Sequence, residues 1–144
     1  MILNFQTKLI SKSCNMNQKA IQIKKIESIL SQKIEDIYRD KLEQKLNNIS
    51  YRLFDRTLIV ILEGTVTSPE KLLKDNNSLC LAKQVREAID RVIHPQIQET
   101  IEEVLNVKVI DFLSDTTIDH DLTGAIAIFE IESQASPTQE KYTA

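Results

Sequence analysis

The sequence predicts a two-layer α+β domain in which helices cover one face of a four-stranded antiparallel sheet. Two long segments, 17–46 and 67–105, place apolar side chains at helical spacing. Four shorter segments, 49–54, 58–62, 107–113 and 124–132, have the alternating or β-branched apolar pattern of strands. The order is therefore α-β-β-α-β-β, and such a chain packs its helices together on one face of the sheet.

Length and composition fit a single domain. The 144 residues are 42% apolar and 27% charged, which is ordinary for a globular protein. We predict a flexible leader at 1–16, one domain at 17–133 and a flexible tail at 134–144. A translation start at Met16 and a weak amphipathic membrane anchor are alternative interpretations of the leader. No segment has the roughly 20 consecutive apolar residues of a membrane-spanning helix, so no span is expected.

Charge and cysteine content exclude several functional classes. The formal net charge is −3, and the acidic residues lie beyond a lysine-rich start. Because nucleic-acid affinity comes mainly from Lys and Arg on phosphates, no nucleic-acid partner is expected. Cys14 and Cys80 form no closely spaced pair, so we expect no disulfide framework and a cytoplasmic location, with a peripheral membrane location as the alternative. Gly64 and Gly124 lie far apart, which excludes a glycine-rich phosphate loop. No cofactor is expected.

The first helix should begin at Asn17 as its N-cap and end near Leu46. The strand at 49–54 then buries one face, whereas the strand at 58–62 is apolar on both faces and should lie centrally in the sheet. Asp55 and Arg56 join these strands as a hairpin. They lack the glycine of a tight turn, so a loop longer than two residues is expected.

The second helical segment opens on a capping box formed by Thr67 and Glu70. The polar residues 75–77 are either a break or a loosened turn. Pro95 should kink or split the helix, because proline removes one backbone hydrogen bond and clashes with the preceding turn. Asn106 suits the left-handed C-cap that ends it. An acidic loop at 114–123 then joins the last two strands.

A few residues could carry chemistry. Asp119, His120 and Asp121 are weak metal-ligand candidates, but consecutive loop residues point in different directions, so we expect a polar hairpin tip and no metal site. Arg86 lies at the border of the buried stripe. It should pair with Asp90 or Glu87, or else contact an anion or a partner.

No catalytic residue is assigned. Cys80 should be a buried, inert thiol, and His94 should cap carbonyl groups freed by the neighbouring proline or face solvent. We expect that the chain is not an enzyme, although the sequence does not decide this. An enzyme would need a cleft that joins His94 or His120 to two or more carboxylates.

The ordered segments resemble the MpsC-like domain family over about residues 20–132. The resemblance rests on a strand ending in glycine at 58–64, the run Thr-Val-Thr-Ser-Pro-Glu at 65–70, the helical pair Val85-Arg86, and strands at 107–115 and 126–131. Val66 and Asn106 depart from the usual leucine and glycine. Recurrent positions of the family are matched by Thr67, Glu70, Arg86 and Asp115.

The resemblance implies an accessory or regulatory domain of a sodium-translocating system that generates membrane potential, with no established catalytic residues. Our leading hypothesis is a domain that acts by protein contact, with a membrane transporter subunit as a partner. A homodimer is also expected, because a four-stranded sheet leaves unprotected edges and the first helix carries a broad apolar stripe. The alternative hypothesis is a small-molecule-binding regulatory module with its site near Arg86 and Asp115.

Overall fold

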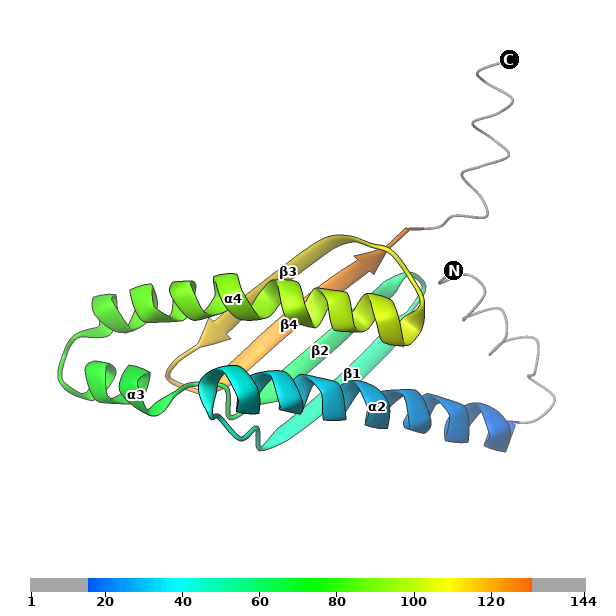
Figure 1. Cartoon of the computed structure of the whole chain (residues 1–144), viewed down its shortest axis with the longest axis horizontal. Coiled ribbons are helices and arrows are strands. Elements are labelled where there is room, and N and C mark those ends of the chain that lie inside the picture. The colour runs from blue at the N-terminus through cyan, green and yellow to red at the C-terminus, as the bar shows by residue number, and fades with distance from the viewer. Residues whose placement is uncertain (1–15, 131–144) are drawn as a thin grey trace, which may run out of the picture.

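The computed structural model describes residues 16–130, and within them the predicted α+β architecture is confirmed. Helices α2 (Met16–Leu42), α3 (Ser68–Asp75) and α4 (Leu79–Leu105) lie on one side of the sheet (Figure 1). The strands are β1 (Asn48–Phe54), β2 (Thr57–Glu63), β3 (Val109–Thr117) and β4 (Leu122–Phe129). The predicted leader and tail lie outside the described residues, apart from Met16, which begins α2.

The sheet is antiparallel throughout, with the strand order β1-β2-β4-β3. Strand β2 is therefore central, as its apolar character on both faces predicts. It pairs with β1 through a local hairpin and with β4 across a long stretch of sequence. The two hairpins of the chain thus join through their inner strands, which leaves β1 and β3 as the edges.

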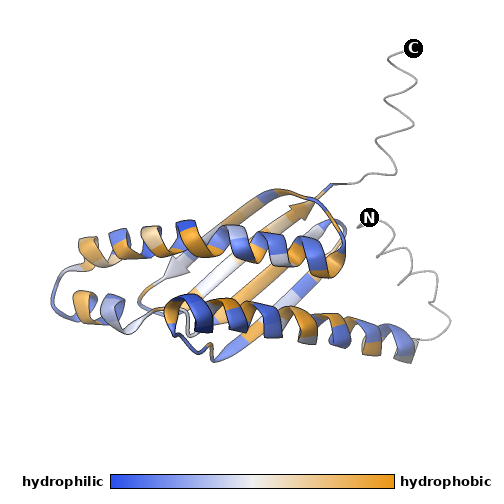
Figure 2. Cartoon of the chain, in the orientation of Figure 1, coloured by the Kyte–Doolittle hydropathy of each residue, from blue (hydrophilic) through white to orange (hydrophobic). Residues whose placement is uncertain are grey.

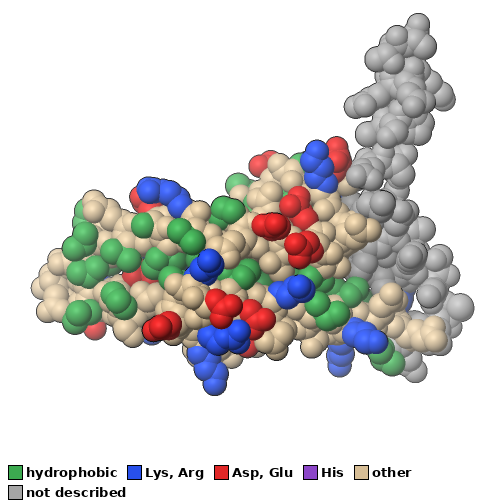
Figure 3. Space-filling model, viewed as in Figure 1, with side chains coloured by type: hydrophobic (Ala, Val, Ile, Leu, Met, Phe, Trp, Pro, Cys, Tyr) green, Lys and Arg blue, Asp and Glu red, His purple; other side chains and the backbone are tan. Residues whose placement is uncertain are grey.

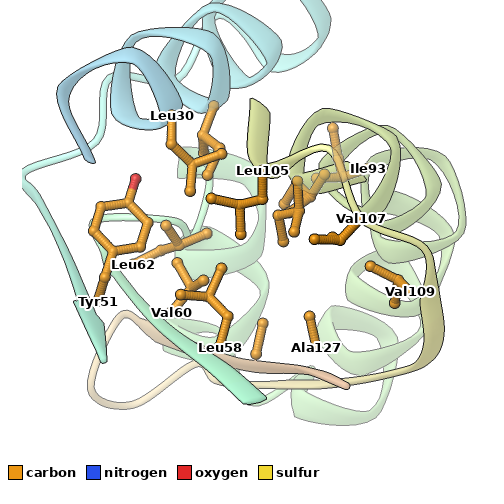
Figure 4. Close-up of a cluster of buried hydrophobic side chains, with 14 of the residues drawn as sticks. Leu30, Tyr51, Leu58, Val60, Leu62, Ile93, Leu105, Val107, Val109 and Ala127 are labelled. Atoms are coloured by element: carbon orange, nitrogen blue, oxygen red, sulfur yellow. The ribbon is translucent and has the colours of Figure 1, made fainter. Parts of the chain in front are cut away.

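The hydrophobic core fills the space between the helices and the sheet (Figure 4). Hydrophobic and hydrophilic residues alternate in bands along α2 and α4 (Figure 2), as expected for helices with one buried face. The helices contribute Leu30, Ile34, Tyr38, Ile93, Ile97, Ile101 and Leu105, and the central strands contribute Leu58, Val60, Leu62, Ala125, Ala127 and Phe129. Successive helix contacts from Ile93 to Leu105 hold α4 along the sheet.

Helix α2 differs from its predicted bounds at both ends. Asn17 lies inside the helix rather than at its N-cap. The helix stops at Leu42, because Glu43 adopts the left-handed conformation with a φ of 52°. Leu46 is nevertheless buried, as its helical spacing suggested. The segment that carries it has left the helix, and the next residue, Asn47, donates its N–H to the carbonyl of Glu63 at 2.8 Å.

The second helical segment breaks at residues 76–78, where Asn77 takes a φ of 61°. The polar stretch that ends at Asn77 therefore separates α3 from α4. Helix α4 continues through Pro95 without interruption, so a split at that residue was wrong. Ile93 and Ile97 are both buried in the same core, and their packing holds the helix together across the missing hydrogen bond. Asn106 is the predicted left-handed C-cap, with φ 54° and ψ 55°.

Both hairpin loops are shorter than expected. Phe54 pairs with Thr57, so Asp55 and Arg56 make a two-residue turn. Asp55 replaces the glycine by adopting a φ of 51° itself, which aspartate tolerates better than most residues. Strand β3 extends to Thr117 and β4 begins at Leu122, so the loop at 114–123 shrinks to 118–121. Threonines suit strands because they are β-branched.

Candidate functional site

A buried ion pair joins α3 to α4. Glu70 in the first turn of α3 is fully buried, and Arg86 of α4 is 5% exposed. The Arg86 guanidinium donates from Nε to Oε1 and from Nη2 to Oε2 of Glu70, both at 2.7 Å. Two parallel charge-assisted hydrogen bonds are the strongest arrangement that an arginine and a carboxylate can form. The predicted pairing of Arg86 with Asp90 is present at 3.3 Å, but the closest partner is Glu70, which the sequence did not suggest.

The loop that precedes α3 satisfies the remaining groups of this pair. Arg86 Nη2 also donates to the carbonyl of Thr65 at 2.8 Å. Glu70 Oε2 accepts both the backbone N–H and the hydroxyl of Thr67, each at 2.8 Å. The predicted capping box is thus present. One carboxylate caps α3 and also binds α4, so Glu70 fixes the position of both helices and of the loop between β2 and α3.

The polar chain continues more weakly along α4. Arg86 Nη1 lies 3.3 Å from Asp90 Oδ1, which is in turn 3.4 Å from His94 Nε2. That last contact lacks hydrogen-bond geometry, and the buried His94 Nε2 has no hydrogen-bond partner among residues 16–130. The His94 ring instead meets Phe112 of β3 edge-on, with ring centres 5.8 Å apart. His94 is therefore half-buried against the sheet, rather than capping helix carbonyls or facing solvent.

Two tyrosines of the core have perturbed acidity. Burial raises the pKa of Tyr38 well above its ordinary value; Arg86 opposes this shift, whereas Asp90 and Glu70 add to it. Burial also raises the pKa of Tyr51 to about 12, although its hydrogen bond with Ser31 acts in the opposite direction. Both phenols therefore stay neutral at physiological pH, as core side chains.

Lysines of α3 hold the β3–β4 hairpin tip, where the weak metal candidates lie. Lys74 pairs with Asp119 at 2.7 Å, and Lys71 pairs with Asp121 at 3.1 Å. Asp121 Oδ1 also accepts the N–H of Val66 at 2.7 Å. The ion pair with Lys74 lowers the pKa of Asp119. His120 is exposed. Within residues 16–130, no group of three His, Cys, Asp or Glu side chains is placed to hold a metal ion.

The two sequence-derived ligand candidates are far apart in the fold. Arg86 lies on the helical side of the sheet, among α3 and α4. Asp115 pairs with Gly124 of β4, next to the buried Ala125, so it projects from the opposite face of the sheet. It is exposed, and its Oδ1 accepts the N–H of Thr116 at 2.9 Å. A small ligand cannot contact both, because the sheet separates them.

A shallow depression of about 550 Å³ lies beside His94. Its lining residues Glu87, Asp90, Arg91, His94 and Pro95 all belong to α4. It places His94 beside the carboxylates of Glu87 and Asp90, the combination of groups that an enzyme would need. Asp90 is already engaged by Arg86, however, and the lining comes from one helix face. The depression therefore has no opposite wall that would position a substrate between reacting groups.

The helical layer leaves an apolar stripe uncovered on its outer side. It consists of Leu81, Val85, Ala88 and Val92 of α4, which follow each other at helical spacing. Leu72 of α3, 63% exposed, lies at the same end of the molecule, where Figure 3 shows hydrophobic side chains gathered. Cys80 is exposed there as well, contrary to the predicted buried thiol. We call the four α4 residues the outer α4 stripe.

The second uncovered apolar surface is the face of the sheet that points away from the helices. Its central residues are Ile59, Ile61, Ile126, Ile128 and Leu113. None of them is fully buried, and Leu113 is 57% exposed. Within residues 16–130, all three helices lie on the other side. We call this surface the open sheet face.

A family model described as "Na+-translocating membrane potential-generating system (MpsC)" matches residues 22–131. The chain belongs to the MpsC family. The match runs from α2 to the end of β4 and so takes in the ion pair and both apolar surfaces. No curated protein and no solved structure matches the chain. None of the described helices of this MpsC-family chain is long and apolar enough to cross a bilayer.

Sequence reasoning missed two features of this MpsC chain that its residues did signal. Glu70 was assigned only a capping role, although a buried arginine one helix away needs a carboxylate partner. The open sheet face was signalled by a central strand that is apolar on both sides, where an antiparallel sheet with helices on one face ordinarily carries polar residues. Both signals become clear only when the helices are placed on a known side.

Proposed function

We propose that this MpsC-family chain is a cytoplasmic, non-enzymatic accessory domain that acts by protein contact on a sodium-translocating membrane system, and that it works as a homodimer. The family description names such a system. The outer α4 stripe is the observation that carries the proposal. It is an apolar surface on the outside of a helix whose other side is buried against α3 and the core, and exposed apolar patches mark sites of protein contact.

The buried Glu70–Arg86 pair supports a structural role for this part of the chain, in which the two helices hold a surface for protein contact. The Glu70 carboxylate accepts four hydrogen bonds, and Arg86 donates to three different residues. These groups are saturated by one another and hold α3 against α4. Their arrangement fixes Leu72 and the outer α4 stripe in one rigid unit, which is what a protein-contact surface requires.

Capture from native membranes tests the proposal. The full-length chain, carrying an affinity tag, is incubated with membranes of its natural host in gentle detergent, and bound proteins are identified by mass spectrometry. We expect recovery of a subunit of a sodium-translocating system. The double variant Leu81→Lys/Val92→Lys should lose that subunit, because two charges in the stripe oppose burial against an apolar partner.

Ile21→Lys is the matched control. Ile21 of α2 is 64% exposed, so the same type of substitution is made at a similarly exposed site away from α4. This variant should retain the subunit. Absence of any sodium-translocating subunit with the wild-type chain, under conditions that preserve the complex, contradicts the proposed function. Equal capture by the stripe variant and the control contradicts the assignment of the contact surface.

A further inference from the structure

The open sheet face has an ordered arrangement of residues. In antiparallel pairs, residues directly opposite each other project from the same face. Arg52 pairs with Ile59, Ile59 with Ile126, and Ile126 with Leu113. These four residues therefore form one row that crosses all four strands from β1 to β3. The row is apolar in the middle and begins with a positive charge at the β1 edge.

The neighbouring rows place negative charge at the other edge. Asp111 pairs with Ile128 and Asp115 with Gly124, so both carboxylates lie on the same face, one on each side of Leu113. Arg52, Asp111 and Asp115 are all exposed, and none of them forms an ion pair within residues 16–130. The open sheet face thus carries a cation at one edge and two anions at the opposite edge, with isoleucines between them.

We propose that a second copy of this chain docks on the open sheet face, with the two-fold axis parallel to the strands. This inference rests on the homodimer in the proposed function and identifies its interface. A rotation about that axis keeps each row in place and exchanges the two edges. Arg52 of one copy then lies over Leu113 of the other copy, between Asp111 and Asp115. The isoleucines of β2 in each copy then contact the isoleucines of β4 in the other copy.

The charges decide between the two symmetric ways of stacking the face on itself. A two-fold axis perpendicular to the strands would place β1 over β1 and β3 over β3. Arg52 would then face its own copy, and Asp111 and Asp115 would face carboxylates. Like charges brought together across an interface are strongly unfavourable. Both axes leave the strands of the two sheets aligned, and only the axis parallel to the strands pairs opposite charges at both edges.

The size of the face sets the strength of the dimer. Four strands at about 4.8 Å spacing and seven residues at about 3.3 Å rise give a footprint of roughly 19 Å by 23 Å. This footprint of roughly 440 Å² lies below the about 600 Å² per partner that marks the small end of specific interfaces. Glu63 lies at the rim, opposite Leu122 of the other copy, and its carboxylate keeps the 2.8 Å hydrogen bond from Asn48. We therefore expect dissociation in the micromolar range.

A charge-swap experiment tests this arrangement. One variant is Arg52→Asp, and the other is Asp111→Arg/Asp115→Arg. Each variant alone brings like charges together at both edges, so its dissociation constant should rise at least about tenfold over wild type. Mixing the two variants restores opposite charges at both edges of a mixed dimer. Equimolar mixtures should therefore recover wild-type affinity, which sedimentation velocity over about 1 to 200 µM can measure.

Controls make each outcome decisive. All substituted residues are exposed, and unchanged urea midpoints will show that the variants fold. Arg52→Ala should weaken the dimer. If the two-fold axis were perpendicular to the strands, the same substitution would strengthen the dimer, because it would remove two like charges that face each other. If the wild-type chain dimerises and the variants have the same dissociation constant, the proposed interface is wrong. The homodimer then forms through another surface. A wild-type monomer throughout the range overturns both, while membrane capture still tests the accessory role separately.

Discussion

Removing either charge of the Glu70–Arg86 pair should destabilise the chain much more than removing both. Glu70→Met leaves the buried guanidinium with only the Thr65 carbonyl and a 3.3 Å contact to Asp90. Arg86→Met leaves a carboxylate buried with no cation bonded to it. Breaking a buried pair from one side costs about 3–5 kcal/mol, which is a large part of the roughly 5–15 kcal/mol of a typical domain.

The double variant Glu70→Met/Arg86→Met removes both buried charges. What remains is the loss of the cap at Thr67 and of a partner for the Thr65 carbonyl, together about 1–3 kcal/mol. The double variant should therefore be more stable than either single variant. Urea unfolding followed by far-ultraviolet circular dichroism gives the four free energies of unfolding. If the effects of the single variants add up to that of the double variant, the two side chains are not coupled and the reasoning fails.

Three further predictions concern the hairpin tip, the two glycines and the buried tyrosines. Asp121→Ala should lower the free energy of unfolding by about 1–2 kcal/mol, because a buried backbone N–H loses its acceptor, whereas Asp119→Ala should leave the urea midpoint unchanged. Gly64→Ala should destabilise by more than about 1 kcal/mol, because φ is +84° and the new Cβ would lie 2.9 Å from the backbone N of Asn47, while Gly124→Ala should be tolerated. Stability should fall between pH 10 and about 12, because the pKa of Tyr51 is raised in the folded chain, and the unfolded chain therefore loses its proton first.

Each of these predictions has a contradicting result. Equal urea midpoints for Asp121→Ala and Asp119→Ala would show that the hairpin tip does not anchor the loop before α3. Equal losses of stability for Gly64→Ala and Gly124→Ala would contradict the claim that the positive φ of Gly64 requires glycine. Phenolate absorbance reports the tyrosines directly. Two of the chain's three tyrosines are Tyr38 and Tyr51, and their full titration near pH 10 with the fold intact would contradict their burial.

The sequence was sufficient for the fold where local patterns and tertiary packing agree. The capping box at Thr67 and the left-handed cap at Asn106 were predictable, because each depends on the chemistry of a few neighbouring residues. Helical spacing at Leu46 was misleading, because burial can be reached by a non-helical segment that folds back onto the core. Pro95 did not split α4, since packing on both sides outweighs one lost hydrogen bond.

The site was less predictable because it depends on contacts between distant residues. Arg86 was recognised as a border residue, but its main partner lies on another helix, and a helical wheel shows only neighbours on the same helix. The placement of Asp115 follows from the strand register, which the apolar pattern at 107–113 does not show. Once the register is known, the same residue becomes one of three charges that give the open sheet face its polarity.

The strand order has a consequence for how the chain reaches its native state. Strand β2 is synthesised early, yet its second neighbour, β4, is the last element of the described chain. Until residues 122–129 leave the ribosome, one flank of a Leu- and Ile-rich strand lacks its partner and can pair with other chains. Shortened products that end before Leu122 should therefore aggregate, and chaperones that shield nascent strands should favour the yield of this protein.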